Sequence, residues 1–405
     1  MGNIAHKQQR VIILGSNPAT RLGLIRSIGE LGEYEIYIVQ LMTQLPKREY
    51  RPADSYSKYV TKCVTAKKYD AEYLYRVLVS ECMQDDCKAV IISVDDDSAC
   101  LVDEIQDRLE QYFICANVNG KVGEIGRLMD KSVQKALAEE AGFRVTQSWI
   151  LECEDGRYEI PEDIVFPCYV KGLISYYSMK KFQGRCDSRE ELEQTLKRVA
   201  SACSYPMLVE EFLEIENDLG VIGYCERGAS VIPGIVELLE SGYGDHKGVS
   251  IYGKVRKERE GEEIISRVAA MMKKVGLTGL FNIDLVVCHG DIYFVELNLR
   301  YAAYGYAVSK AGVNLPAYFV KSAFGECISE LRYKIDADRY YMNEKVAIDD
   351  FMGGHRSLKN VCELRKQVDF GLVKDVHDNR PYRMLWCDAI RIWCKQKAKK
   401  ALGKS

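Results

Sequence analysis

One stretch of the chain carries more structural information than any other. It reads Gly279-Leu-Phe-Asn-Ile-Asp-Leu-Val-Val-Cys-His-Gly-Asp-Ile-Tyr-Phe-Val-Glu-Leu-Asn-Leu-Arg300. Its two halves alternate between apolar and polar residues around His289-Gly290-Asp291, which predicts a β-hairpin with a three-residue loop. Such a loop sets Cys288 opposite Ile292.

Counting back two by two from that pair sets Asp284 opposite Glu296. Because side chains alternate between the two faces of a strand, Asn282 and Asn298 share the face of these acids. Carboxylates within roughly 5 Å repel each other, and a hard cation such as Mg²⁺ would neutralise them. The alternative is a solvated strand face, which more often carries Lys, Thr and Glu of mixed sign. The convergence of two acids and two amides, with Arg300 directly after them, favours the metal site.

The composition is that of a globular protein and excludes several function classes. The 405 residues, 47% hydrophobic and 28% charged, are enough for two or three packed units. A net charge of −3 gives no reason to expect nucleic acid as a partner. The 15 scattered cysteines and five histidines predict neither a zinc site nor a disulfide framework. A polar N-terminus and the lack of long apolar runs predict a cytoplasmic protein with free thiols.

The first part of the chain alternates strands and helices. A turn at Gly15 follows the first apolar run but matches neither the dinucleotide fingerprint nor the P-loop. It is either a plain strand-to-helix turn or the edge of a crevice that holds part of a substrate, since open α/β sheets bind ligands there. Continuous apolar strands separated by helices argue for a parallel sheet covered on both faces. The strands are expected at 11–14, 34–39, 88–93 and 112–115.

Asp284, followed by Glu296-x-Asn298-x-Arg300, resembles the metal and phosphate signature of the ATP-grasp superfamily. The segment 311–316, Ala-Gly-Val-Asn-Leu-Pro, is similar to its carbamoyl-phosphate-synthase-like branch. The resemblance implies an α/β fold in which an N-terminal parallel-sheet domain precedes two α+β subdomains that hold ATP between them. It implies Mg²⁺, or Mn²⁺ in its place, on Asp284, Glu296 and Asn298. Arg300 would be the catalytic residue that steadies the transferred phosphoryl group.

The same resemblance assigns residues to ATP. Lysines at a helix start and at a strand end would bind its phosphates. The strand near 208–213 would read the adenine, and a residue shortly after it would take the ribose hydroxyls. These residues are Lys131, Lys171, Glu210, Phe212, Leu213 and Asn217.

Two loops depart from the family pattern or stay open. The phosphate loop after Lys171 keeps only Gly172, Ser175 and Ser178 of the usual Gly/Ser-rich turn, and Lys180 and Lys181 add charge. The Gly-rich loop at 241–248 is expected to face the site. Its His246 either touches substrate or is merely solvated.

The resemblance covers roughly residues 11 to 325 and divides the chain into four parts. The first is an N-terminal domain, the next two are subdomains A and B, with the metal hairpin in B, and the last is a C-terminal extension with a basic tail. Their expected bounds are 1–116, 117–204, 205–355 and 356–405.

The implied function is an ATP-dependent ligase that joins a small-molecule carboxylate to an amine through an acyl phosphate. Short matches at 14–17, 24–29 and 375–381 are similar to cell-envelope carboxylate–amine ligases such as D-aspartate ligase. Homodimers are common in the superfamily. Two alternatives are a small-molecule kinase on the same fold and a non-catalytic nucleotide-binding protein.

The last segment predicts a helix with Trp386, Ile390 and Trp393 on one face, followed by lysines. A docked terminal helix with a solvated basic end is favoured over a helix that lies on an anionic membrane surface.

Overall fold

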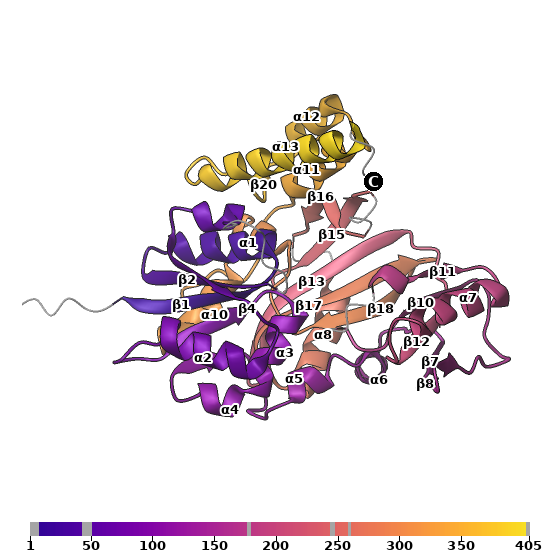
Figure 1. Cartoon of the computed structure of the whole chain (residues 1–405). Helices are drawn as coiled ribbons and strands as arrows, with labels where there is room; N and C mark the ends of the chain where they lie inside the picture. Colours follow the sequence, from indigo (N-terminus) through magenta and orange to yellow (C-terminus); the bar gives the residue numbers. More distant parts are fainter. Residues whose placement is uncertain (1–7, 43–50, 176–179, 244–247, 258–260, 402–405) are drawn as a thin grey trace, which may run out of the picture.

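The computed structural model describes residues 8–42, 51–175, 180–243, 248–257 and 261–401. Figure 1 shows a purple N-terminal unit on one side and a small lobe on the other, with a long twisted sheet between them. The last helix, α13, lies across the top of this view.

The N-terminal unit is built on a five-stranded sheet in the order β3-β2-β1-β4-β5. Every pair in it is parallel. Val11 and Ile13 face one core cluster, whereas Ile12 and Leu14 face another, so both sides of the sheet are covered. The expected parallel sheet is thereby confirmed. Its elements are β1 (Gln9–Gly15), α1 (Pro18–Gly29), β2 (Tyr34–Leu41), the 3-10 helix η1 (Ala53–Tyr56), β3 (Val60–Ala66), α2 (Ala71–Cys82), β4 (Ala89–Ser93), α3 (Asp96–Glu104), α4 (Gln106–Leu109) and β5 (Phe113–Cys115).

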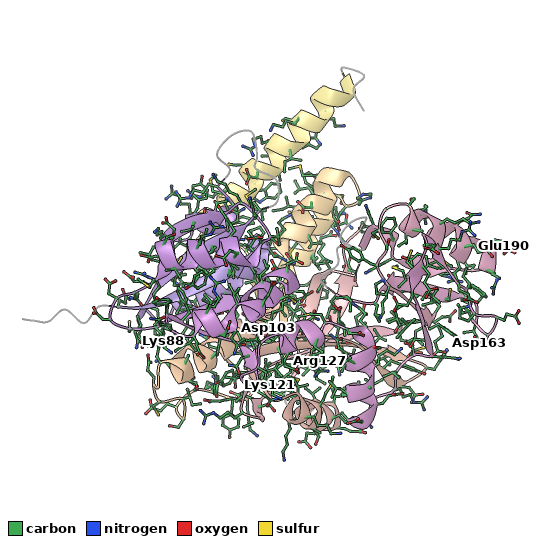
Figure 2. All side chains as sticks on the ribbon, turned by 60° about the horizontal axis from the view of Figure 1, so that its bottom comes forward. Lys88, Asp103, Lys121, Arg127, Asp163 and Glu190 are labelled. Carbon is green, nitrogen blue, oxygen red and sulfur yellow. The ribbon has the colours of Figure 1, made fainter. Side chains whose placement is uncertain are left out.

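The small lobe is a four-stranded antiparallel sheet in the order β11-β10-β12-β7, with α7 packed against it. Asp163 and Glu190 mark its outer side in Figure 2. Because β12 hydrogen-bonds to β10 and β7, the expected boundary between residues 204 and 205 would detach β12 from its own sheet. We therefore place the boundary after β12. The elements are β7 (Ser148–Leu151), β8 (Cys153–Glu154), β9 (Arg157–Tyr158), β10 (Cys168–Gly172), η2 (Lys180–Phe182), β11 (Gly184–Cys186), α7 (Arg189–Ala200) and β12 (Met207–Glu211).

The long sheet follows the order β18-β17-β13-β15-β16-β19-β20, with β14 beside β13 and β6 beside β17. Since β20 lies beyond residue 356, the expected C-terminal extension contributes a strand to this sheet. Its strands are β6 (Asn117–Val118), β13 (Asn217–Glu226), β14 (Ala229–Val231), β15 (Ile235–Ser241), β16 (Ser250–Val255), β17 (Leu277–Cys288), β18 (Asp291–Asn298), β19 (Arg339–Met342) and β20 (Phe370–Gly371).

Amphipathic helices cover this sheet. Helix α8 places Ile264, Val268 and Met271 at helical spacing, and all three are buried in the core beneath β17. Two glycines at positive φ, Gly261 and Gly276, flank the helix. Apart from α7 of the small lobe, the α-helices after β6 are α5 (Glu124–Arg127), α6 (Lys131–Glu140), α8 (Glu262–Val275), α9 (Gly305–Lys310), α10 (Leu315–Ala323), α11 (Glu344–Gly353), α12 (Leu358–Lys366) and α13 (Arg380–Ala401).

The hairpin of β17 and β18 corrects one expectation and confirms another. Cys288 pairs with Asp291 and not with Ile292, because the turn has two central residues, His289 and Gly290. Their φ values of 51° and 77° are those of a type I′ turn. Farther from the turn, a β-bulge leaves one residue of β18 without a partner on β17. The shorter turn and the bulge shift the register by one residue in opposite directions, so their effects cancel.

Asp284 therefore does pair with Glu296, as expected. Phe294 pairs with Leu285, and both are buried in the core. Without the bulge at Val295, Phe294 and Glu296 would lie on the same face of the sheet. The bulge thus lets one strand send a phenyl ring into the core and a carboxylate to the opposite face.

The C-terminal segment is tied to the N-terminal unit through a buried ion pair. Arg26 on α1 donates from Nε to Oδ2 of Asp378 at 3.1 Å, and the two side chains are 0% and 2% exposed. Ser57 also donates to this carboxylate. No helix in the described ranges is long and apolar enough to cross a membrane.

Candidate active site

Asp284 and Glu296 form the centre of the site. Both oxygens of Asp284 accept from amides: Asn282 Nδ2 donates to Oδ1 at 2.8 Å, and Asn298 Nδ2 donates to Oδ2 at 3.1 Å. The hydroxyl of Tyr304 donates in turn to the oxygen of Asn282. The structure thus brings together the two acids and the two amides that the hairpin pattern places on one face.

Glu296 faces cations and donors from two other elements. Lys131, the first residue of α6, lies 3.1 Å from Oε1 of Glu296. The hydroxyl of Ser175 donates to the same oxygen at 2.5 Å, and Lys131 Nζ donates to that hydroxyl at 2.8 Å. The predicted phosphate lysine and one serine of the phosphate loop therefore converge on the acid pair.

Their surroundings separate the pKa values of the two carboxyls. Burial raises the pKa of Asp284 to about 6, and the nearby charge of Glu296 adds to the rise. Burial also opposes ionisation of Glu296, but Lys131 and Ser175 outweigh it and lower the pKa to about 2. Both carboxyls are therefore largely ionised at neutral pH, and the charge of Glu296 is paired with Lys131.

A second buried cluster surrounds Glu210 on β12. Lys171 on β10 lies 2.6 Å from Oε2 of Glu210, and Lys135 on α6 lies 3.0 Å from Oε1. Thr146 donates to Oε1 as well, at 2.9 Å. Burial would raise the pKa of Glu210, but the two lysines outweigh it and lower that pKa. Both predicted ATP residues in this cluster are present, and their carboxylate and ammonium groups bind each other.

Lys135 is a member of this cluster that the sequence analysis does not single out. It follows Lys131 by four residues, so both lie on one face of α6, and both are buried. Two buried lysines at that spacing are unusual, because a lysine is rarely buried without an acidic partner. That spacing is the sequence signal that could have found Lys135.

Arg300 links the hairpin to the N-terminal unit. Its Nη2 donates to the oxygen of Asn298 at 2.9 Å, and its Nε donates to Asp96 on α3 at 3.0 Å. Asp96 begins the helix at the carboxyl edge of the parallel sheet, next to the turn at Gly15. The turn at Gly15 therefore lies near the predicted catalytic arginine, and both interpretations of that turn stay predictions.

Of the remaining predicted nucleotide residues, Phe212 and Leu213 follow β12, and Asn217 is the first residue of β13. Phe212 donates its backbone N–H to the carbonyl of Pro167, and the guanidinium of Arg185 lies 4.6 Å from its ring centre. Leu213 follows it and is half-buried. Asn217 donates to Glu237. Their roles toward a nucleotide stay predictions.

Some predicted residues cannot be placed. Ser178 and His246 lie outside the described residues, as does the side chain of Lys180. Lys181 is exposed, with its Nζ 4.8 Å from the ring centre of Phe182.

The donor set of the acid pair suits Mg²⁺. Within the described ranges, no group of three or more His, Cys, Asp or Glu side chains could hold a metal ion by itself. Two carboxylates fit an ion that takes its other ligands from water and phosphate oxygens, as Mg²⁺ does. The oxygen of Asn298 accepts from Arg300, so Asn298 would reach such an ion only after its amide turned.

Known structures share this architecture. N5-carboxyaminoimidazole synthetase from Staphylococcus aureus, complexed with ADP, superposes with a TM-score of 0.63 at 15% identity, over 89% of this chain and 87% of that one. The biotin carboxylase domain of Hydrogenobacter thermophilus 2-oxoglutarate carboxylase, with MgADP and bicarbonate, gives 0.63 at 16% identity, over 83% and 74%. L-amino acid ligase from Bacillus licheniformis gives 0.57 at 13% identity, over 81% and 78%.

The chain has the ATP-grasp fold. Sequence relatives of this ATP-grasp chain include the carbamoyl phosphate synthase large chain of Methanosphaerula palustris, 30% identical over 164 residues, or 39% of this chain. That of Gemmatimonas aurantiaca is 26% identical over 228 residues, or 55% of this chain. The matches span only 15% and 20% of those relatives' own lengths. No protein-family profile matches the chain.

Proposed function

We propose that this chain is an ATP-dependent ligase that forms a C–N bond between a small-molecule carboxylate and an amine. The observation that carries the proposal is the Asp284–Glu296 pair, held by two amides and faced by Lys131 and Arg300. Two solved structures of this fold are complexes with ADP and MgADP, which supports ATP and Mg²⁺ as the ligands of this ATP-grasp site.

The residues of the site fit the steps of such a reaction. The substrate carboxylate would attack the γ-phosphorus of ATP, which breaks the bond to the β-γ bridging oxygen and releases ADP. Lys131 and Lys171 would hold the phosphates, because their ammonium groups are already fixed by the carboxylates of Glu296 and Glu210. The amine would then attack the acyl phosphate and release inorganic phosphate. Arg300 would neutralise charge on the transferred group.

Mg²⁺ would be held by Asp284 and Glu296. When bound, it would neutralise the negative charge of the phosphate oxygens. The amides of Asn282 and Asn298 hold the carboxylate of Asp284 in place on the strand that pairs with Glu296. Tyr304 fixes Asn282 in the same way.

A role in cell-envelope or surface-polymer synthesis is the finer part of the proposal. It rests on short sequence matches at 14–17, 24–29 and 375–381, and the last two are in contact. Arg26 and Asp378, one in each segment, form a buried ion pair with each other. The matched residues therefore have a packing role, and the substrates must be found by experiment.

A panel of amino acids and other carboxylates, tested singly and in pairs with amines, distinguishes the alternatives. A ligase releases inorganic phosphate from ATP only when both partners are present, and it forms the amide. A kinase would phosphorylate one compound without the second and release no free phosphate. ATP binding without turnover on any pair would instead favour a non-catalytic nucleotide-binding protein.

A further inference from the structure

Helix α13 is buried on one face only for its first half. Leu385 and Ala389 are 8% and 7% exposed, and they pack with Leu22 of α1 and Ile348 of α11. Trp386 lies at the edge of the same cluster. This part is the docked terminal helix that the sequence favours.

The apolar stripe of α13 does not stop where the contact with the body stops. Leu385, Ala389 and Trp393 follow one another at four-residue intervals, so they lie on one face of the helix. Trp393 is nevertheless 40% exposed, and Ile390 and Ile392 beside it are 50% and 52% exposed. Figure 2 shows the last turns of this yellow helix projecting beyond the rest of the molecule.

The charge of this end is of one sign. From Ala389 to Ser405 the sequence carries six lysines and arginines and no acidic residue, although the whole chain has a net charge of −3. Arg391 and Lys395 are exposed. The ammonium group of Lys397 lies 5.6 Å from the ring centre of Trp393, so the apolar stripe and the positive charge adjoin.

We propose that the exposed end of α13 binds an anionic lipid surface. Tryptophan, isoleucine and lysine on one short helix suit the boundary between headgroups and acyl chains, where rings and aliphatic chains enter and ammonium groups stay at the phosphates. A symmetric dimer through α13 would bring two such stretches side by side, and their like charges would repel. The proposal does not depend on the reaction that the ATP-grasp site performs.

Co-sedimentation with vesicles tests the proposal on the full chain. We expect the chain to pellet with vesicles of phosphatidylcholine mixed with phosphatidylglycerol, and not with phosphatidylcholine alone. Lys395→Gln with Lys397→Gln should weaken binding about 25-fold, since each basic residue near an anionic surface contributes roughly a factor of five. Ile392→Ser with Trp393→Ser should weaken it by more than about tenfold.

Ile150→Ser is the matched control. Ile150 is 47% exposed on β7 of the small lobe, away from α13, so this variant should bind as the original does. Unchanged thermal unfolding of each variant shows that it is folded. Equal binding to neutral and anionic vesicles, no binding, or full binding by the Ile392/Trp393 variant would overturn the proposal. So would a dimer in light scattering that the Ile392/Trp393 variant dissolves while vesicles bind neither protein.

Discussion

Among single residues, Glu210 forms two buried ion pairs. Its carboxylate lies between Lys135 and Lys171, and all three side chains are buried. Glu210→Gln would leave two buried ammonium groups without a negative partner, which costs about 3–5 kcal/mol of stability. We expect a lower thermal unfolding midpoint for this variant. Glu211→Gln, at the next and less buried position, is the control and should change the midpoint little.

The same glutamate predicts how stability depends on pH. The pKa of Glu210 is lowered in the folded protein from its ordinary 4.5, because the two lysines outweigh burial. Its contribution is therefore fully present above pH 4.5 and is lost as pH falls through the lower, folded value. The stability difference between the original chain and Glu210→Gln should shrink over that acidic range. A difference that stays constant from neutral to acidic pH would contradict this assignment.

Some residues of the site can be predicted from the sequence and others cannot. The acid pair and Lys131 could be found, because a hairpin pattern and a helix start place them locally. Thr146 and Asp96 could not, because they meet Glu210 and Arg300 only through long-range packing. Neither carries a local pattern that sets it apart.

At the scale of elements, the packing of β13 against β17 positions the acid pair. Gly220 on β13 lies opposite Asp284, and a Cβ there would come within 2.0 Å of the Tyr304 hydroxyl. Gly220→Ala must therefore displace Tyr304 and, through Asn282, disturb Asp284. We expect the rate of ATP-dependent phosphate release to fall by on the order of 100-fold, as small misplacements at reacting groups do.

Gly126→Ala is the control for that variant. Gly126 lies on α5, where an added Cβ would approach only Asp103, at 3.9 Å. The phosphate-release rate should be unchanged. An equal loss of rate in both variants, or a full rate in Gly220→Ala, would show that the Tyr304 contact does not position the acids.

In the hairpin, the predicted pairing of the two acids is correct although the predicted loop length is wrong. The sequence predicts three loop residues, whereas the turn has two and a bulge on β18 supplies the third. Ile292 to Val295 are all apolar or aromatic, so their pattern does not reveal where the alternation slips. A bulge is a backbone feature, and its position cannot be recognised in a run of residues that are all apolar or aromatic.

At the scale of the whole molecule, the seam between α1 and the C-terminal segment holds the two ends of the chain together. Asp378→Asn would leave Arg26 buried without its charge partner, at a cost of about 3–5 kcal/mol. We expect faster hydrogen exchange in α13, which begins two residues after Asp378. Glu363→Gln, on an exposed pair with Lys359, should leave exchange in α13 unchanged.

The parallel sheet and the hairpin follow from periodic patterns, so the sequence predicts them. The seam does not, because Arg26 and Asp378 are 352 positions apart. The sheet to which β12 belongs is hidden from the sequence for a related reason. The apolar pattern of a strand indicates that the strand is buried. Only its hydrogen bonds show to which sheet it belongs.

Titration calorimetry can show whether Asp284 and Glu296 hold a magnesium–nucleotide complex. ATP should bind the original chain more tightly with Mg²⁺ than with a chelator present. Glu296→Gln should remove that dependence on Mg²⁺. Asp291→Asn, which alters an exposed acid in the same hairpin, should keep it. Equal ATP affinity with and without Mg²⁺ in the original chain, or an unchanged Mg²⁺ effect in Glu296→Gln, would contradict a magnesium–nucleotide complex at this pair.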